Sequence, residues 1–134
     1  MDRLSPERRS WLMSRIKGSN TKPEMEVRSL LHALGYRFRL HRRDLPGTPD
    51  IVLPRREAVV FVHGCFWHGH ACKRTKMPKS RVSFWVQKIQ ANRKRDAKNR
   101  RALKAFGWKV VIVWECELKH LDKLTSKLYK SLGD

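Results

Sequence analysis

The sequence predicts a mixed α/β domain built around one central sheet. Helical and strand patterns follow one another in the order helix, helix, strands, helix, strand, helix, which is typical of this class. Residues 58–62 form a continuous apolar run and residues 108–114 a nearly continuous one, as in strands that are buried on both faces. The chain has 134 residues, of which 40% are apolar, so we expect a single domain over residues 1–134.

Two helices are expected first. A Ser-Pro-Glu sequence at residues 5–7 places proline at a first helical position, and this helix ends near residues 17–18. Thr21 and Glu24 match a capping box that opens a second helix, which ends at Gly35. The apolar residues expected to face the core from this second helix are Met25, Leu30, Leu31 and Leu34.

Short strands are expected next. Residues 36–40 alternate apolar and basic side chains, which predicts a half-exposed strand. A turn at residues 45–49 precedes a short apolar strand at residues 51–53, which Pro54 ends. The run at residues 58–62 then supplies a fully buried strand.

A long basic helix, a strand and a final helix complete the expected domain. The helical pattern at residues 83–106 is rich in Lys and Arg and stops at Gly107. The strand at residues 108–114 begins and ends with Trp108 and Trp114, which we expect in the core. The last helix is predicted by an inward stripe of Leu118, Leu121, Leu124 and Leu128.

The charge of the chain predicts nucleic acid as its partner. Thirty-one Lys and Arg stand against twelve Asp and Glu, which gives a net charge of +19 and a pI near 10.8. No apolar run approaches the ~20 residues of a membrane span, and the polar start of the chain is unlike a signal peptide. Three cysteines cannot all pair, so we expect the reducing cytoplasm, where Cys serves as a metal ligand or a core residue.

The segment at residues 63–72 (HGCFWHGHAC) concentrates three His, two Cys and two large aromatic residues. His70, Cys72 and Cys116 are candidate zinc ligands, with Asp96 as the fourth. The alternative for Asp96 is an ion pair with Arg100 one helical turn further on. The alternative for the whole segment is a loop with a partly buried aromatic pair.

Asp50 lies at the entrance of an apolar strand, where a carboxylate needs a cation, a proton or several hydrogen-bond donors. It is therefore a candidate Mg²⁺ ligand, with His63 beside it across a hairpin to move protons. The alternative is a turn aspartate that caps backbone amides. Glu24 can be explained by helix capping alone, and His68 is either a base or a bystander.

Large aromatic residues interrupt the basic sequence at Phe66, Trp67, Phe84 and Trp85. On a DNA-binding surface such side chains can wedge between base pairs, and a mismatched step costs less to unstack than a paired one.

Four motifs together resemble the very-short-patch-repair (Vsr) DNA mismatch endonucleases. They are LPGTPD at residues 45–50, VHGCFWH at 62–68, FW at 84–85 and VWEC at 113–116. The resemblance runs in order from about residue 9 to residue 118. It implies a restriction-endonuclease-like fold, with a central mixed sheet flanked by helices and a structural zinc site. It also implies nicking of one strand of double-stranded DNA beside a T:G mismatch left by deamination of 5-methylcytosine.

The resemblance also implies roles for individual residues. Asp50 and the backbone carbonyl of Val62 match the Mg²⁺ ligands. His63 and His68 match the catalytic histidines, with Glu24 as the acid that supports His68. The structural zinc ligands would be His70, Cys72, Asp96 and Cys116. The residues that intercalate beside the mismatch would be Phe66, Trp67 and Trp85. Met13 would contact DNA from a helix within residues 1–20 that grips the duplex.

One departure from the wider fold concerns the residues that follow the Pro-Asp pair. Where relatives of that fold carry acid-x-Lys, residues 61–63 read Phe-Val-His, so histidine must handle protons in place of lysine. Some Vsr members have Thr where this chain has Val62, and a carbonyl ligand survives that difference.

Three other functions are compatible with the residues. The first is a restriction- or homing-type nuclease that cuts both strands of matched DNA, which would need a dimer or paired sites. The second is a zinc-stabilised DNA-binding module without catalysis, and the third is an RNA-binding module. We expect a monomer that cooperates with mismatch-repair proteins.

Overall fold

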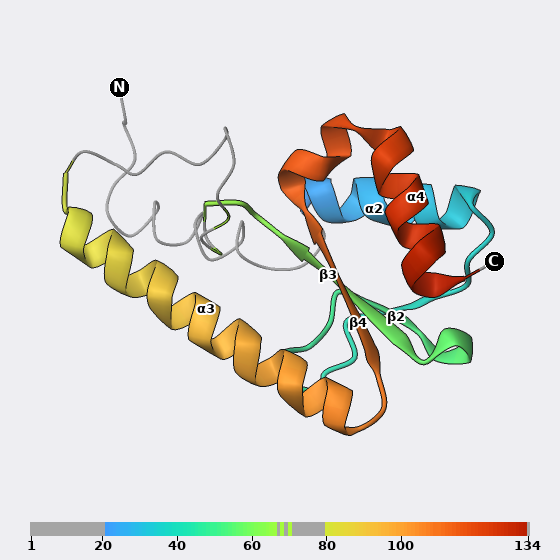
Figure 1. Cartoon of the computed structure of the whole chain (residues 1–134), viewed down its shortest axis with the longest axis horizontal. Coiled ribbons are helices and arrows are strands. Elements are labelled where there is room, and N and C mark those ends of the chain that lie inside the picture. Colours follow the sequence, from blue (N-terminus) through green and yellow to red (C-terminus); the bar gives the residue numbers. More distant parts are fainter. Residues whose placement is uncertain (1–20, 67, 69, 71–79, 134) are drawn as a thin grey trace.

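The computed structural model describes residues 21–66, 68, 70 and 80–133. It contains a four-stranded mixed sheet in the order β1-β2-β3-β4, as the sequence predicted (Figure 1). The pairs β1–β2 and β2–β3 are antiparallel, whereas β3 and β4 run parallel. The strands are β1 (Arg39–Leu40), β2 (Ile51–Leu53), β3 (Ala58–His63) and β4 (Lys109–Trp114).

Helices cover both faces of this sheet. Figure 1 shows α2 (Lys22–Ala33) and α4 (Leu121–Leu132) together on one side and α3 (Val82–Ala105) on the other. Two 3₁₀ helices, η1 (Pro54–Arg56) and η2 (Glu115–Lys119), follow β2 and β4. None of the helices in the described part of the chain is long and apolar enough to cross a bilayer.

The two faces of β3 explain its uninterrupted apolar sequence. Ala58 and Val60 belong to the core under α2 and α4, whereas Val59 and Phe61 belong to the core under α3, because successive strand residues point to opposite faces. Over residues 58–61 the strand is therefore covered on both sides and carries no polar side chain, which confirms the buried strand expected here.

The parallel pairing of β3 with β4 positions the site. Helix α3 forms the crossover between these strands, and the register pairs His63 with Trp114 at their carboxyl ends. The segments that follow the two strands therefore leave the same edge of the sheet. The described residues of the first segment are 64–66, 68 and 70, and the second segment is η2.

Several expectations about individual residues are wrong. Met25 is 47% exposed because Val27 and Leu31 provide the inner face of α2. Leu121 is 52% exposed because Leu118 lies in η2, so the stripe is not one continuous helix and Leu132 continues the buried row of α4 instead.

The strand expected at residues 36–40 is reduced to Arg39–Leu40. Tyr36 is buried instead, and its hydroxyl donates to the carbonyl of Gly133. Trp108 and Trp114 are only partly buried, against the core position expected for them. The helix expected at residues 5–18 lies outside the described residues.

Candidate active site

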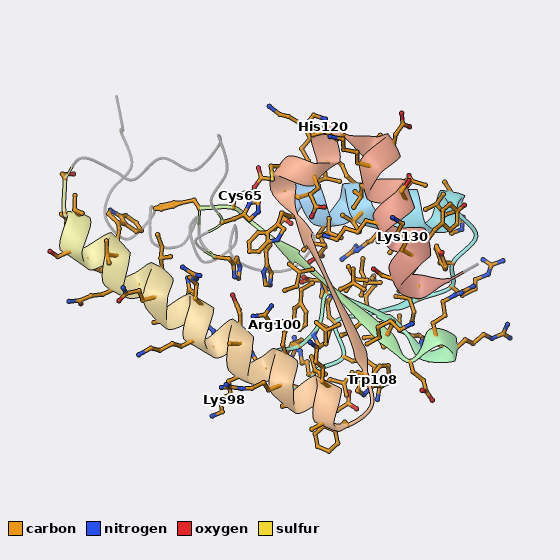
Figure 2. All side chains as sticks on the ribbon, in the orientation of Figure 1. Cys65, Lys98, Arg100, Trp108, His120 and Lys130 are labelled. Atoms are coloured by element: carbon orange, nitrogen blue, oxygen red, sulfur yellow. The ribbon has the colours of Figure 1, made fainter. Side chains whose placement is uncertain are left out.

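A cavity of about 830 Å³ lies between the sheet edge and α3. One wall carries Glu24, Asp50 and His63, and the opposite wall is one face of α3. Figure 2 shows Arg100 reaching from α3 toward the sheet, whereas Lys98 points away from it. The α3 residues that line the cavity are Lys88, Asn92, Arg95, Asp96, Asn99 and Arg100.

Asp50 sits where β2 begins, and the backbone amide of Val62 donates to its carboxylate at 2.7 Å. Burial and, after it, the neighbouring carboxyl of Glu24 together raise the pKa of Asp50 to about 7, although the Val62 amide opposes the shift. The hydrogen bond from the Val62 amide agrees in part with the turn-aspartate alternative, but it does not offset the effect of burial on the pKa of Asp50. A carboxyl with this pKa holds a proton that a divalent cation can replace.

Glu24 forms half of the predicted capping box, since its backbone amide donates to Thr21 Oγ1 at 3.4 Å. Its buried carboxylate does more than cap a helix. Arg28 donates to Oε2, and His41 Nε2 lies 3.1 Å from the same oxygen. The candidate ligand atoms of Glu24, His41 and Asp50 all lie within 4.8 Å of one another. Glu24 therefore belongs to the Asp50 site.

The rings of His63 and His68 are stacked, with centroids 3.7 Å apart and planes 4° apart. His63 is buried, and within the described residues its Nδ1 has no hydrogen-bond partner. Burial lowers the pKa of His63 to about 4, and the charge of His68 contributes to this shift. His63 is therefore neutral at pH 7.

The acid that contacts His68 is Asp96, whose Oδ2 lies 2.5 Å from His68 Nδ1. This contact differs from the sequence expectation, in which Glu24 supports His68 and Asp96 binds zinc; both of those roles stay predictions. The alternative ion pair with Arg100 is not formed among the described residues either. Asp96 can reach His68 because helix geometry places it on the face of α3 that lines the cavity.

A second cluster brings together Cys65, His70 and Cys116, whose candidate ligand atoms lie within 4.8 Å of one another. The Sγ of Cys116 is 3.6 Å from His70 Nδ1, and the His70 ring stacks on Trp114 with centroids 4.2 Å apart. The turn that places Cys65 beside His70 is closed by the His70 amide, which donates to the Cys65 carbonyl at 2.9 Å.

Cys65 was not among the zinc ligands expected from the sequence. Its signal was its place five residues before His70 in the same Cys- and His-rich segment. Cys72 lies outside the described residues. Thiolate and imidazole donors are the ligands that zinc prefers, so the chemistry of this cluster fits that ion.

Aromatic side chains gather at the amino end of α3. The Trp85 ring lies 5.4 Å from the Phe66 ring and 5.0 Å from the Phe84 ring, between centroids. Phe84 is 43% exposed, with the Arg81 guanidinium 4.5 Å above its ring. The other predicted DNA contacts, Trp67 and Met13, lie outside the described residues. Intercalation remains a prediction.

The family model described as DNA mismatch endonuclease Vsr matches residues 1–74, which is more than half of the chain. The chain also resembles the DNA mismatch endonuclease Vsr of Escherichia coli K12, with 43% identity over 89% of this chain and 76% of the relative. The chain belongs to the Vsr family. Other similar proteins are type II nicking enzymes. V.XorIIP of Xanthomonas oryzae is 61% identical over 95% of this chain and 93% of the relative. V.NmeAIP of Neisseria meningitidis is 46% identical over 89% of this chain and 85% of the relative.

Membership of the Vsr family fixes the broad activity. This Vsr protein is a DNA nicking endonuclease, and its basic cavity wall and net charge of +19 suit a DNA substrate. The predicted restriction-endonuclease-like α/β fold is confirmed at the same level. Family membership also argues against a module without catalysis.

Proposed function

We propose that this Vsr protein nicks one strand of duplex DNA beside a T:G mismatch, in very short patch repair, and that it depends on Mg²⁺. The observation that carries the proposal is the buried Asp50 beside Glu24, in a cavity that is also lined by the His68–Asp96 pair and by cationic side chains of α3. An acid pair for a cation, a held imidazole and positive charge for phosphate are the parts that phosphodiester hydrolysis needs.

Asp50 and the carbonyl of Val62 would hold the Mg²⁺ ion, which acts as a Lewis acid on the scissile phosphate when bound. With Asp96 accepting from Nδ1 of His68, the Nε2 lone pair of His68 would take the proton of the attacking water. The neutral His63 ring, stacked on His68, keeps that imidazole in place and offers a hydrogen bond to a phosphate oxygen.

A panel of duplexes with each strand labelled separately tests the mismatch preference. We expect a nick in one strand of the T:G duplex in Mg²⁺, none in chelator, and at least about tenfold slower nicking of the paired duplex, since unstacking a paired step costs about 1.4 kcal/mol or more in addition. Cleavage of both strands of matched DNA would instead support a restriction-type nuclease.

The raised pKa of Asp50 predicts that Mg²⁺ binds more weakly at low pH. Below pH 7 the cation must displace a proton from Asp50, so we expect an affinity about tenfold lower at pH 6 than at pH 8. Calorimetry in buffers of different ionisation enthalpy measures both the affinity and the proton released. An affinity that stays constant from pH 6 to 8 would contradict this role of Asp50.

We also propose a structural zinc ion held by Cys65, His70 and Cys116, with Cys72 as the fourth ligand. The three described donors come from the segment after β3 and from η2. An ion at that point would crosslink the two segments that leave the sheet edge beside the cavity, in a domain whose charges repel one another.

Two variants distinguish this ligand set from the one expected from the sequence. We expect Cys65→Ser to lose zinc and to lower Tm by about 10 °C, because losing a ligand costs roughly 3 kcal/mol or more. Asp96→Asn should keep one zinc ion per chain and lose nicking activity, because it disturbs only His68. Metal analysis and thermal unfolding measure both results. Zinc loss in Asp96→Asn but not in Cys65→Ser would instead support the ligand set expected from the sequence, in which Asp96 binds zinc.

A further inference from the structure

His41 has no part in the proposed chemistry, yet its side chain reaches the candidate cation site. It directly follows β1, and its Nε2 lies 3.1 Å from Glu24 Oε2 on α2. The side chain is 24% exposed, whereas that of Glu24 is only 4% exposed. His41 therefore covers the outer side of a buried carboxylate.

The backbone of His41 has a conformation that residues other than glycine rarely adopt. Its φ of +48° lies in the left-handed region, while its amide donates to the carbonyl of Asp50 at 3.3 Å. The β1–β2 hairpin is thus extended by one bond to Asp50, and the chain then turns. A strained backbone at a functional cavity persists only where surrounding contacts hold it.

The contacts of His41 restrict the orientation of Glu24. Rotation about the last bond of a glutamate side chain has only broad intrinsic preferences, so the carboxylate plane must be fixed by its partners. Arg28 and His41 contact the same oxygen, Oε2, from helix α2 and from the segment after β1. Rotating this carboxylate would break both contacts.

Two adjacent carboxylates repel each other unless a proton or a cation lies between them. The candidate ligand atoms of Glu24 and Asp50 lie within 4.8 Å of each other, so the two acids are close neighbours. A group that keeps Glu24 in this place maintains the repulsion, and so maintains the attraction of the pair for a divalent cation.

We propose that His41 is a positioning residue for the divalent cation: it donates from Nε2 to Glu24 and holds that carboxylate beside Asp50. The inference rests on the proposed cation at Asp50. Partners that orient the groups around a metal typically change its affinity by about 10–100-fold when they are removed.

The test compares two amides at position 41. His41→Asn keeps a residue that tolerates positive φ but is too short to reach Glu24, whereas His41→Gln places an amide donor near the position of Nε2. We expect His41→Asn to raise the Kd for Mn²⁺ about tenfold or more and His41→Gln to stay within about threefold of the parent protein. The control is His32→Ala, an exposed position on α2, which should leave the Kd unchanged.

Mn²⁺ binding to the DNA-free chain is measured by the electron paramagnetic resonance signal of the free ion, alongside Tm. A His41→Asn protein with lower Tm and unchanged Kd would show a purely structural role and overturn the inference. Equal weakening in His41→Gln would overturn the hydrogen bond as the cause. Failure of the parent protein to bind Mn²⁺ would instead contradict the proposed cation site itself.

Discussion

Asp50→Asn is expected to reduce nicking of a T:G duplex by at least about 10³-fold while DNA affinity stays within about threefold. The loss follows because an amide cannot supply the negative charge that holds a divalent cation and offsets charge at the phosphate. The fold should survive, since the Asn oxygen can still accept from the Val62 amide. The raised pKa of Asp50 means that its charged form costs stability, so we expect an equal or higher Tm at pH 8.

Single-turnover nicking, DNA binding by fluorescence anisotropy and thermal unfolding measure these three quantities. Asp44→Asn is the matched control, because Asp44 is an exposed acid paired with Arg42 at 2.7 Å and lies outside the cavity. It should nick at the parent rate. Residual nicking within tenfold in Asp50→Asn, or a loss of DNA binding with intact nicking chemistry, would contradict the assignment of Asp50 to the cation.

DNA binding is expected to weaken about 10³–10⁵-fold between 50 and 200 mM salt, if roughly 6–10 phosphates are contacted. The net charge of +19 and the basic residues of the cavity wall make counterion release the main source of affinity. Anisotropy titrations with the Asp50→Asn protein in Mg²⁺-free buffer measure the slope without cleavage. A salt response below tenfold would contradict this account.

Single substitutions locate the phosphate contacts. Arg95→Gln removes a cation that lines the cavity and should lower the salt slope by about one. Lys98→Gln should change the slope less, because Lys98 points away from the sheet and does not line the cavity (Figure 2). Equal effects of the two variants would show that α3 binds DNA through more than its cavity face.

The element order and the buried strands were predictable because they depend on neighbouring residues. Residues 58–61 point alternately into the two cores, so none of these positions suits a polar side chain. Gly107, with φ of +91°, follows the end of α3 as the pattern predicted. The errors at Met25 and Leu121 are of another kind. A helical stripe gives the spacing of apolar residues, but the partner surface decides which of them are covered.

The site residues were partly predictable. Asp50 was predicted from one unfavourable placement, a carboxylate at the entrance of an apolar strand. In the structure this carboxyl is buried, and the burial raises its pKa. The functions of Glu24 and Asp96 could not be assigned in the same way, because the sequence contains several acids near several histidines and no local rule pairs them. His41 gave no sequence signal at all, since the contact of its side chain with Glu24 depends on a turn that only the folded hairpin reveals.

The sequence alone determined which chemical groups this protein has: its excess of positive charge, its Cys- and His-rich segment, and the motifs that place it in the Vsr family. Only the tertiary structure decided which of these residues meet. The parallel register of β3 with β4 brings Cys116 to Cys65 and His70, and the crossover helix brings Asp96 to His68. Such pairs are separated by about thirty to fifty residues of chain, so their proximity depends on strand register and helix facing, which neighbouring residues do not encode.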